Sequence, residues 1–244
     1  EKRINEIKKY INSLYVILPF EKEFFESKHN YPVKFLGHPL ADSIYNFKTN
    51  YNSSNKFITA DKKPIIAILP GSRKQEIKKI LNTVIETVEY FKEYQFIVAG
   101  APNIELSYYT SIIKNKKIKV IENKTYELLS VSYAAIVTSG TATLETALFK
   151  VPQVVCYKSS YFSFIIAKLI VNIKYISLVN LIMDQEIVKE LIQQDCNKNK
   201  ITEELKKILD LKHRKSLKVK YDELASILGN FGTSKRVALD IITK

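Results

Sequence analysis

The stretch PIIAILPGSRKQEI at residues 64–77 joins a short apolar run to a pattern with helical spacing. The run PIIAIL is rich in isoleucine and predicts a buried strand. From Ile77 to Phe91 apolar residues recur every three or four positions, which predicts an amphipathic helix. A proline and a glycine stand between the two patterns, where the chain must leave the strand. The stretch therefore predicts one strand–turn–helix unit of an α/β fold.

The same alternation continues along the chain. Apolar runs at residues 95–99, 118–121, 134–138 and 153–157 predict strands, and helical patterns near 106–114, 126–131 and 141–148 lie between them. This repetition predicts a Rossmann-like domain over residues 64–200, a parallel sheet with helices on both faces. Further helices are expected at residues 162–171, 185–194, 202–209, 216–228 and 234–242, the last three within a set of C-terminal helices over residues 201–244.

The N-terminal part has a different pattern. A helix is expected at residues 4–13 and strands at 15–18 and 33–36, so residues 1–40 are interpreted as the tail of a second Rossmann-like domain. Residues 41–63 are expected to form a linker, since their second half is polar and contains Ser53, Ser54 and Asn55.

The composition narrows the class of protein. The chain has 244 residues and a net charge of +13, mostly from lysine. A lysine-rich composition needs no functional explanation, although it also suits an anionic membrane surface or phosphates. No run of basic residues alternates with aromatic ones, so nucleic acid is disfavoured. Two distant cysteines are expected to stay reduced, and three scattered histidines predict no metal site. No cofactor is expected.

Neither a signal peptide nor a membrane-spanning segment is expected. The longest apolar stretch, at residues 162–173, is short and contains Lys168. Because the chain begins with Glu1 and its only methionine is Met183, we expect the natural protein to extend upstream.

The turn PGSR follows the predicted strand at residues 64–69. Gly71 allows the backbone to approach a ligand, and Ser72 can cap the helix whose first amides favour an anion. Arg73 offers a planar fork for phosphate, and Glu76 lies near the positive end of the helix. An ordinary strand-to-helix turn with a surface arginine remains an equally good interpretation of these four residues.

The segment TSGTATLE at residues 138–145 places a similar turn after another strand. Its small residues open a helix whose free amides can hold a pyrophosphate, and Glu145, one turn later, can accept the hydroxyls of a ribose. A well-capped helix with an ion-paired glutamate is the alternative. Neither turn matches the dinucleotide-binding or P-loop motif. The residues expected to supply amides are Ser139, Gly140, Thr141, Ala142 and Thr143.

Several motifs, in this order and spacing, resemble the lipid-A-disaccharide synthase family. They are PFEKEFF, VKFLGHPLAD, IAILPGSRKQEI, TSGTATLETAL, VPQVVCYK and YISLVNLIMDQEIVKELIQQDC. The resemblance covers residues 15–196 and, loosely, the C-terminal helices. It departs from the family where Val179 replaces a proline before Asn180, and most of the N-terminal domain is absent.

The resemblance implies a two-domain GT-B glycosyltransferase of lipid A and lipopolysaccharide biosynthesis in Gram-negative bacteria. Such an enzyme transfers diacylglucosamine from UDP-2,3-diacylglucosamine to 2,3-diacylglucosamine 1-phosphate (lipid X), releases UDP and needs no metal. It would be cytoplasmic and peripheral to the inner membrane, with homodimerisation as a further family expectation. Arg73 would contact the diphosphate and Glu145 the ribose. The remaining donor contacts would be Asn180, Glu190 and Gln193, and the general base would lie in the absent N-terminal domain.

Two other functions stay open. One is another UDP-sugar enzyme of the same fold, such as an N-acetylglucosaminyltransferase or a UDP-N-acetylglucosamine 2-epimerase. The other is a non-catalytic module that binds UDP. The choice of donor separates the first from a lipid A enzyme, because only the latter requires acylated sugars.

Overall fold

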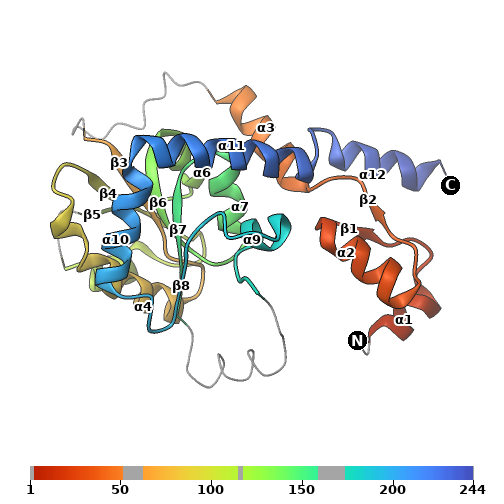
Figure 1. The fold of residues 1–244 in the computed structure, drawn as a ribbon, viewed down its shortest axis with the longest axis horizontal. Helices are drawn as coiled ribbons and strands as arrows, with labels where there is room; N and C mark the ends of the chain where they lie inside the picture. The colour runs from red at the N-terminus through yellow and green to blue at the C-terminus, as the bar shows by residue number, and fades with distance from the viewer. Residues whose placement is uncertain (1–2, 52–62, 115–117, 159–173, 244) are drawn as a thin grey trace. The chain divides into compact units, whose positions relative to one another are not determined.

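The computed structural model describes residues 3–51, 63–114, 118–158 and 174–243 (Figure 1). The chain divides into two compact units, Asn52–Tyr221 and a smaller one that combines Glu1–Tyr51 with Asp222–Lys244. The helix α11 (Leu211–Leu228) contains the boundary between them. This division places residues 222–244 with the N-terminal segment rather than with α10 (Lys198–Leu209).

The larger unit contains a six-stranded sheet in which every neighbouring pair is parallel. The spatial order is β5-β4-β3-β6-β7-β8, so the direction of progression reverses between β3 and β6. The strands are β3 (Ile65–Leu69), β4 (Gln95–Gly100), β5 (Ile118–Glu122), β6 (Ser132–Thr138), β7 (Gln153–Tyr157) and β8 (Glu190–Ile192).

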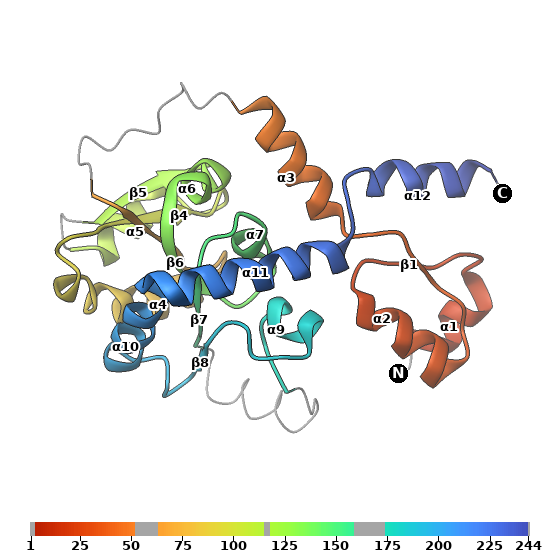
Figure 2. The same cartoon turned by 45° about the horizontal axis from the view of Figure 1, so that its top comes forward.

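Helices cover both faces of this sheet. Because alternate strand residues point to opposite sides, each strand contributes side chains to an apolar cluster on either face. Ile66 and Ile68 join one apolar cluster and Ala67 and Leu69 the other. The first cluster includes side chains of α4 (Lys74–Ile85), the 3-10 helix η2 (Val88–Tyr90), α5 (Leu106–Ile112), α10 and the start of α11. The second includes those of α6 (Thr125–Val131) and α7 (Thr141–Leu148) (Figure 1 and Figure 2). The predicted α/β architecture is confirmed.

One predicted helix is a strand. Residues 185–194 were expected to be helical, but Glu190–Ile192 form β8 and pair with β7 from Val155↔Glu190 to Tyr157↔Ile192. Val188 and Leu191 are both buried and lie three residues apart, which imitates helical spacing. Pairing at the sheet edge decides the conformation of this segment. The short α9 (Leu178–Met183) precedes it, and the helix predicted at residues 162–171 lies outside the described residues.

The smaller unit contains a two-stranded parallel pair, β1 (Tyr15–Val16) and β2 (Lys34–Phe35). The C-terminal helix α12 (Thr233–Ile242) contacts the N-terminal segment at both of its ends. The Asp42 carboxylate accepts hydrogen bonds from the amides of residues 232–234, and Lys34 Nζ lies 2.6 Å from Asp240 Oδ1. The other elements of this unit are α1 (Arg3–Tyr10), α2 (Pro19–Glu23), the π-helix η1 (Phe24–Lys28) and α3 (Pro39–Asn50).

The linker expected over residues 41–63 begins as a helix. In α3, Pro39 occupies the first turn, and His38 Nδ1 accepts a hydrogen bond from the Leu40 amide at 3.1 Å. Proline is favoured at the start of a helix because its fixed φ suits that position and its missing N–H is not needed there. Pro39 is therefore the sequence signal that marks the start of this helix. Residues 52–62 lie outside the described residues.

Candidate functional site

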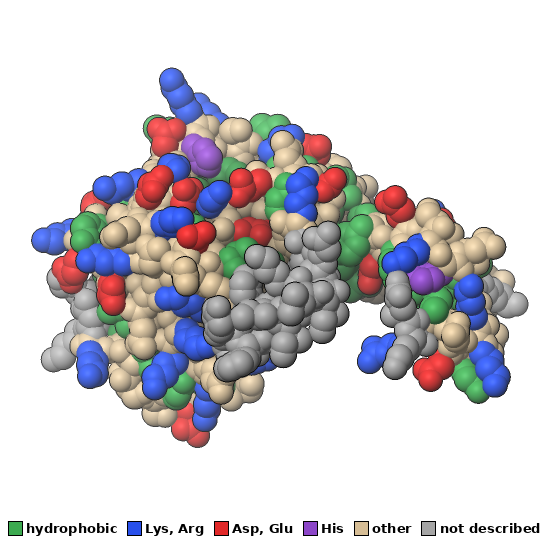
Figure 3. Space-filling view, turned by 60° about the horizontal axis from the view of Figure 1, so that its bottom comes forward, with side chains coloured by type: hydrophobic (Ala, Val, Ile, Leu, Met, Phe, Trp, Pro, Cys, Tyr) green, Lys and Arg blue, Asp and Glu red, His purple; other side chains and the backbone are tan. Residues whose placement is uncertain are grey.

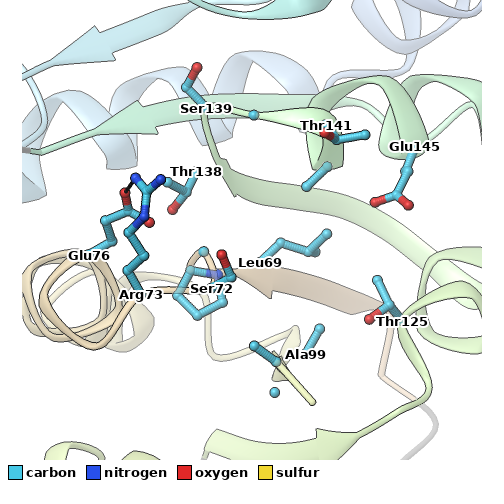
Figure 4. A pocket seen from close by; sticks show the side chains of 16 residues that line it. Leu69, Ser72, Arg73, Glu76, Ala99, Thr125, Thr138, Ser139, Thr141 and Glu145 are labelled. Atoms are coloured by element: carbon cyan, nitrogen blue, oxygen red, sulfur yellow. Dashed lines mark hydrogen bonds and ion pairs between the residues drawn. The ribbon is translucent and has the colours of Figure 1, made fainter. Parts of the chain in front are cut away.

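A pocket of about 460 Å³ opens in the larger unit at the carboxyl ends of β3, β4 and β6. It lies where the strand order reverses, which is where open parallel α/β sheets bind their ligands. Small-molecule sites typically have volumes of roughly 300–1,000 Å³. The lining residues are Leu69, Pro70, Gly71, Ser72, Arg73, Glu76, Ala99, Gly100, Ala101, Thr125, Thr138, Ser139, Gly140, Thr141, Ala142 and Glu145 (Figure 4).

The first turn requires glycine at position 71. Its φ is +100°, and an added Cβ would lie 3.0 Å from Glu76 Oε2. The helix α4 begins at Lys74 with Arg73 as its N-cap, so Ser72 is not the capping residue that the sequence predicted. Arg73 Nη1 lies 3.0 Å from Glu76 Oε1, and this ion pair lies at one end of the pocket in Figure 4.

The second turn also contains a glycine with an unusual backbone. Gly140 has φ of +153° and is the N-cap of α7, and an added Cβ would meet nothing within 4 Å. The first amides of a helix have no partner within the helix, so those that follow Gly140 can bind an anion. The backbone at this turn is therefore open to a ligand on the pocket side.

Two hydroxylated residues of this turn are engaged elsewhere. Ser139 Oγ donates to the carbonyl oxygen of Ile176 at 2.7 Å. Thr143 is fully buried, its hydroxyl donates to the Gly140 carbonyl at 2.8 Å, and it does not line the pocket. The Thr143 backbone N–H, which was expected to hold the diphosphate, donates to the Gly140 carbonyl at 3.1 Å, and its contact with a ligand remains a prediction.

Glu145 is part-buried at the other end of the pocket, near Thr125 (Figure 4). Tyr126 Oη donates to Glu145 Oε1 at 3.0 Å. Burial raises the pKa of the Glu145 carboxyl above its ordinary value, and the hydrogen bond from Tyr126 opposes that rise. Burial, together with the neighbouring carboxylate, raises the pKa of Tyr126. A carboxylate in this position can accept hydrogen bonds from a pair of ligand hydroxyls.

The other three residues named as donor contacts lie outside this pocket. Glu190 accepts hydrogen bonds from the Ile176 amide, the Ser177 amide and hydroxyl, and Asn180 Nδ2, at 2.7–2.9 Å. Asn180 is fully buried, and its Oδ1 accepts from the amides of residues 187 and 188. The backbone N–H of Gln193 donates to the backbone carbonyl of Tyr157. These contacts organise residues 176–193, and direct contact with the donor remains a prediction.

The sequence hypothesis missed several pocket residues. Ala99 and Gly100 end β4, Ala101 follows it, and Thr125 begins α6. Thr138 ends β6, immediately before the recognised turn. Their common signal is position, since each lies at or just beyond the carboxyl end of a strand, or at the start of the helix that follows.

Other expectations concern residues away from the pocket. Cys156 lies in β7 as expected, and both cysteines are buried and free. Within the described ranges, no group of three or more histidine, cysteine or acidic side chains is arranged to hold a metal ion. The helices of those same ranges include none with the length and hydropathy needed to cross a membrane.

Comparisons with known proteins agree with these observations. The family model described as lipid-A-disaccharide synthetase matches residues 1–239. The lipid-A-disaccharide synthase of Coxiella burnetii (strain Dugway 5J108-111) is 34% identical over an alignment of 241 positions, which covers 97% of this chain and 64% of the relative. That of Persephonella marina is 33% identical over an alignment of 250 positions, which covers 97% of this chain and 66% of the relative.

Solved structures share the fold at low identity. The S. aureus MnaA–UDP co-structure has a TM-score of 0.66 at 16% identity, and covers 96% of this chain and 62% of that one. The calicheamicin glycosyltransferase CalG4 has a TM-score of 0.60 at 12% identity, and covers 100% of this chain and 56% of that one. A putative UDP-N-acetylglucosamine 2-epimerase from Listeria monocytogenes has a TM-score of 0.63 at 15% identity, and covers 94% of this chain and 59% of that one. The fold is thus that of GT-B glycosyltransferases and UDP-GlcNAc 2-epimerases. The chain spans about 64% of the length of the Coxiella relative. The family match over nearly every residue shows that the chain belongs to the lipid-A-disaccharide synthase family of glycosyltransferases.

Proposed function

We propose that this chain supplies the donor-binding part of a lipid-A-disaccharide synthase. The donor would be UDP-2,3-diacylglucosamine and the acceptor 2,3-diacylglucosamine 1-phosphate, giving the β-1,6 disaccharide and UDP. One observation carries the proposal: two glycine turns, an arginine and a carboxylate line a single pocket at the point where the strand order reverses.

The arrangement suits a nucleoside diphosphate. Arg73 and the start of α4 lie at one end of the pocket, and Glu145 lies at the other (Figure 4). An arginine and helix N-terminal amides bind phosphate oxygens, and a carboxylate accepts ribose hydroxyls. During transfer, negative charge develops on the departing UDP. Hydrogen-bond donors of the protein that are already held in place stabilise that charge without reorganisation.

The complete reaction is proposed for the whole protein, because this chain spans only 64–66% of the two relatives compared. Glycosyl transfer also needs a positioned acceptor and a general base within hydrogen-bond reach of its hydroxyl. We assign both to the part of the family's length that the chain does not span.

We further propose a cytoplasmic protein at the surface of the inner membrane, acting as a homodimer. The net charge of +13 supports attraction to anionic lipids. Basic and acidic side chains are interspersed on the face of the larger unit in Figure 3, so the support comes from total charge rather than from a patch on that face.

Calorimetric titration of the 244-residue chain with UDP, UMP and ADP tests the donor assignment. UDP should bind more tightly than UMP, because the pocket offers groups for two phosphates, and more tightly than ADP if uracil is recognised. Equal binding of UDP and ADP would contradict a uridine site. Binding of UDP-N-acetylglucosamine in preference to the diacylated donor would favour the epimerase or N-acetylglucosaminyltransferase alternative.

Arg73→Ala tests the phosphate assignment. A hydrogen bond to a charged group contributes about 1.5–3 kcal/mol. The Arg73 side chain is 81% exposed, so we expect the lower end, about 1.5 kcal/mol or tenfold in the dissociation constant for UDP. Lys78→Ala removes an exposed charge from the same helix without touching the pocket and should leave binding unchanged. Equal affinities for both variants would refute the role of Arg73.

A further inference from the structure

The hydroxyl of Thr138 lies in the pocket wall without a hydrogen-bond partner among the described residues. Thr138 ends β6 and is only 6% exposed, and its Oγ1 is inaccessible to solvent. A buried hydroxyl without a partner destabilises the folded state, because it has lost its hydrogen bonds to water and gained none. Such groups are rare in native proteins, and each requires an explanation.

Four fully or nearly fully buried threonines of the larger unit do not share this feature, whereas the hydroxyl of part-buried Thr202, away from the pocket, does. The hydroxyls of Thr83, Thr87, Thr143 and Thr146 each donate to a backbone carbonyl three or four residues earlier, at 2.7–3.0 Å. Thr138 is in a strand, where the carbonyls three and four residues earlier do not lie beside the side chain as they do in a helix. It is also the single pocket-lining residue among the five described side chains that have buried, unpartnered polar atoms.

The surroundings of Thr138 indicate what its partner is. A Cβ built on Gly71 would lie 3.5 Å from Thr138 Cγ2, so the first turn passes directly beside this side chain. The second turn follows Thr138 in the chain, with Gly140 as the N-cap of α7. In Figure 4 Thr138 lies on the side of the pocket where Arg73 is drawn, away from Glu145. The hydroxyl therefore lies between the two turns that favour an anion.

We propose that Thr138 is a ligand-contact residue whose hydroxyl donates a hydrogen bond to a phosphoryl oxygen of the bound nucleoside diphosphate. The inference rests on the proposed donor site for its ligand, while its own observation is the unpartnered hydroxyl. A phosphoryl oxygen is an acceptor without a proton, so it matches a hydroxyl that has no acceptor. Ribose would be held at the opposite end, by Glu145.

Thr138→Val separates this role from a structural one, because valine keeps the shape and removes the hydroxyl. Without ligand, the melting temperature should stay equal or rise by up to about 5 °C, since an unsatisfied polar group is removed. Affinity for UDP and for inorganic pyrophosphate should fall about ten- to hundredfold, as for loss of a hydrogen bond to a charged group. Affinity for uridine should not change.

Thr87→Val is the matched control. Thr87 is fully buried, and its hydroxyl donates to the Val84 carbonyl at 2.7 Å, outside the pocket. This variant should lose stability and keep its affinity for UDP. Thr138→Ser retains a hydroxyl and should bind like the wild type. If the valine variant does not fold, Thr138→Ala against Thr138→Ser decides by the same affinities.

The outcomes distinguish this inference from the donor assignment. UDP binding that Thr138→Val leaves within about twofold of the wild type overturns the role of Thr138 and keeps the donor site. A folded Thr138→Val variant that loses both stability and affinity also overturns the role of Thr138, because the hydroxyl would then be structural. If Thr138→Val weakens pyrophosphate binding while the wild type does not prefer UDP over ADP, the result supports the phosphate contact of Thr138 and contradicts the uridine site. A folded wild-type chain that binds neither ligand overturns both.

Discussion

Tyr126→Phe tests whether the carboxylate of Glu145 is held ready for a ligand. The substitution removes the hydroxyl that donates to Glu145 Oε1 at 3.0 Å. It keeps the ring, which packs against Phe149 with the ring centroids 5.2 Å apart. The expected result is weaker UDP binding, with the loss growing as the pH falls.

The magnitude follows from the hydrogen bond. A bond to a carboxylate contributes about 1.5–3 kcal/mol, but Tyr126 would reach the ligand only through Glu145. We therefore expect about half of that near neutral pH, or a three- to tenfold rise in the dissociation constant. Because the bond from Tyr126 lowers the pKa of Glu145 against the effect of burial, its loss raises that pKa further.

The direction of the pH effect is fixed by these shifts. Ribose hydroxyls need an ionised acceptor, so affinity is lost as the pH falls through the Glu145 pKa, and in the variant that loss begins at a higher pH. For folding the sign is opposite. A raised carboxyl pKa means that the folded state binds this proton more tightly than the unfolded chain, so the contribution to stability falls as the pH rises through the folded-state pKa.

Calorimetric titration with UDP from mildly acidic to neutral pH measures both effects. Tyr31→Phe is the control, because it removes a tyrosine hydroxyl bonded to the Ile11 carbonyl in the smaller unit. A UDP analogue without the 2′- and 3′-hydroxyls should bind Tyr126→Phe and the wild type equally. If Tyr126→Phe matches the wild type for UDP at every pH, Glu145 does not depend on Tyr126 and the reasoning fails.

Two further substitutions test the framework around the pocket. Gly71→Ala places a Cβ at a φ of +100° and 3.0 Å from Glu76 Oε2, and should lower the free energy of unfolding by about 1–2 kcal/mol in urea titrations; an unchanged midpoint would contradict the strain. Glu190→Gln turns a side-chain amide toward the hydrogen-bond donors of residues 176–180 and should lower the free energy of unfolding by about 2–3 kcal/mol in the same assay. The control Glu186→Gln, in an exposed pair with Lys189, should lower it by about 0–1 kcal/mol.

The sheet could be predicted because its signals are local. The β3 sequence IIAIL is buried at every position, and continuous apolar runs of this length are typical of strands covered on both faces. The turns after β3 and β6 could be identified as well, since a glycine stands two residues beyond the end of each strand. The strand order could not be predicted from such runs, although it is what brings the two turns to one pocket.

Elements that depend on distant partners were predicted less well. The strand β8 has three residues, and it is paired only with β7 in the described sheet. The sequence around it, with Val188 and Leu191 three apart, favours a helix. Glu190 and Asn180 lie in motifs typical of the family, yet their hydrogen bonds are made to each other and to nearby backbone. Membership of a motif alone does not distinguish a ligand contact from a residue that holds a loop.

Neighbouring residues at the end of β6 show why that distinction needs the structure. Ser139 belongs to the recognisable turn and Thr138 precedes it, so sequence reasoning selects the serine. The Ser139 proton is directed to the Ile176 carbonyl, whereas the Thr138 hydroxyl has no acceptor among the described residues. Since a buried donor without a partner is costly, the ligand gains more from Thr138 than from a hydroxyl that must first break an existing bond. Ser139→Ala should therefore weaken UDP binding less than Thr138→Ala, and the reverse order would show that the Ile176 bond yields to the ligand.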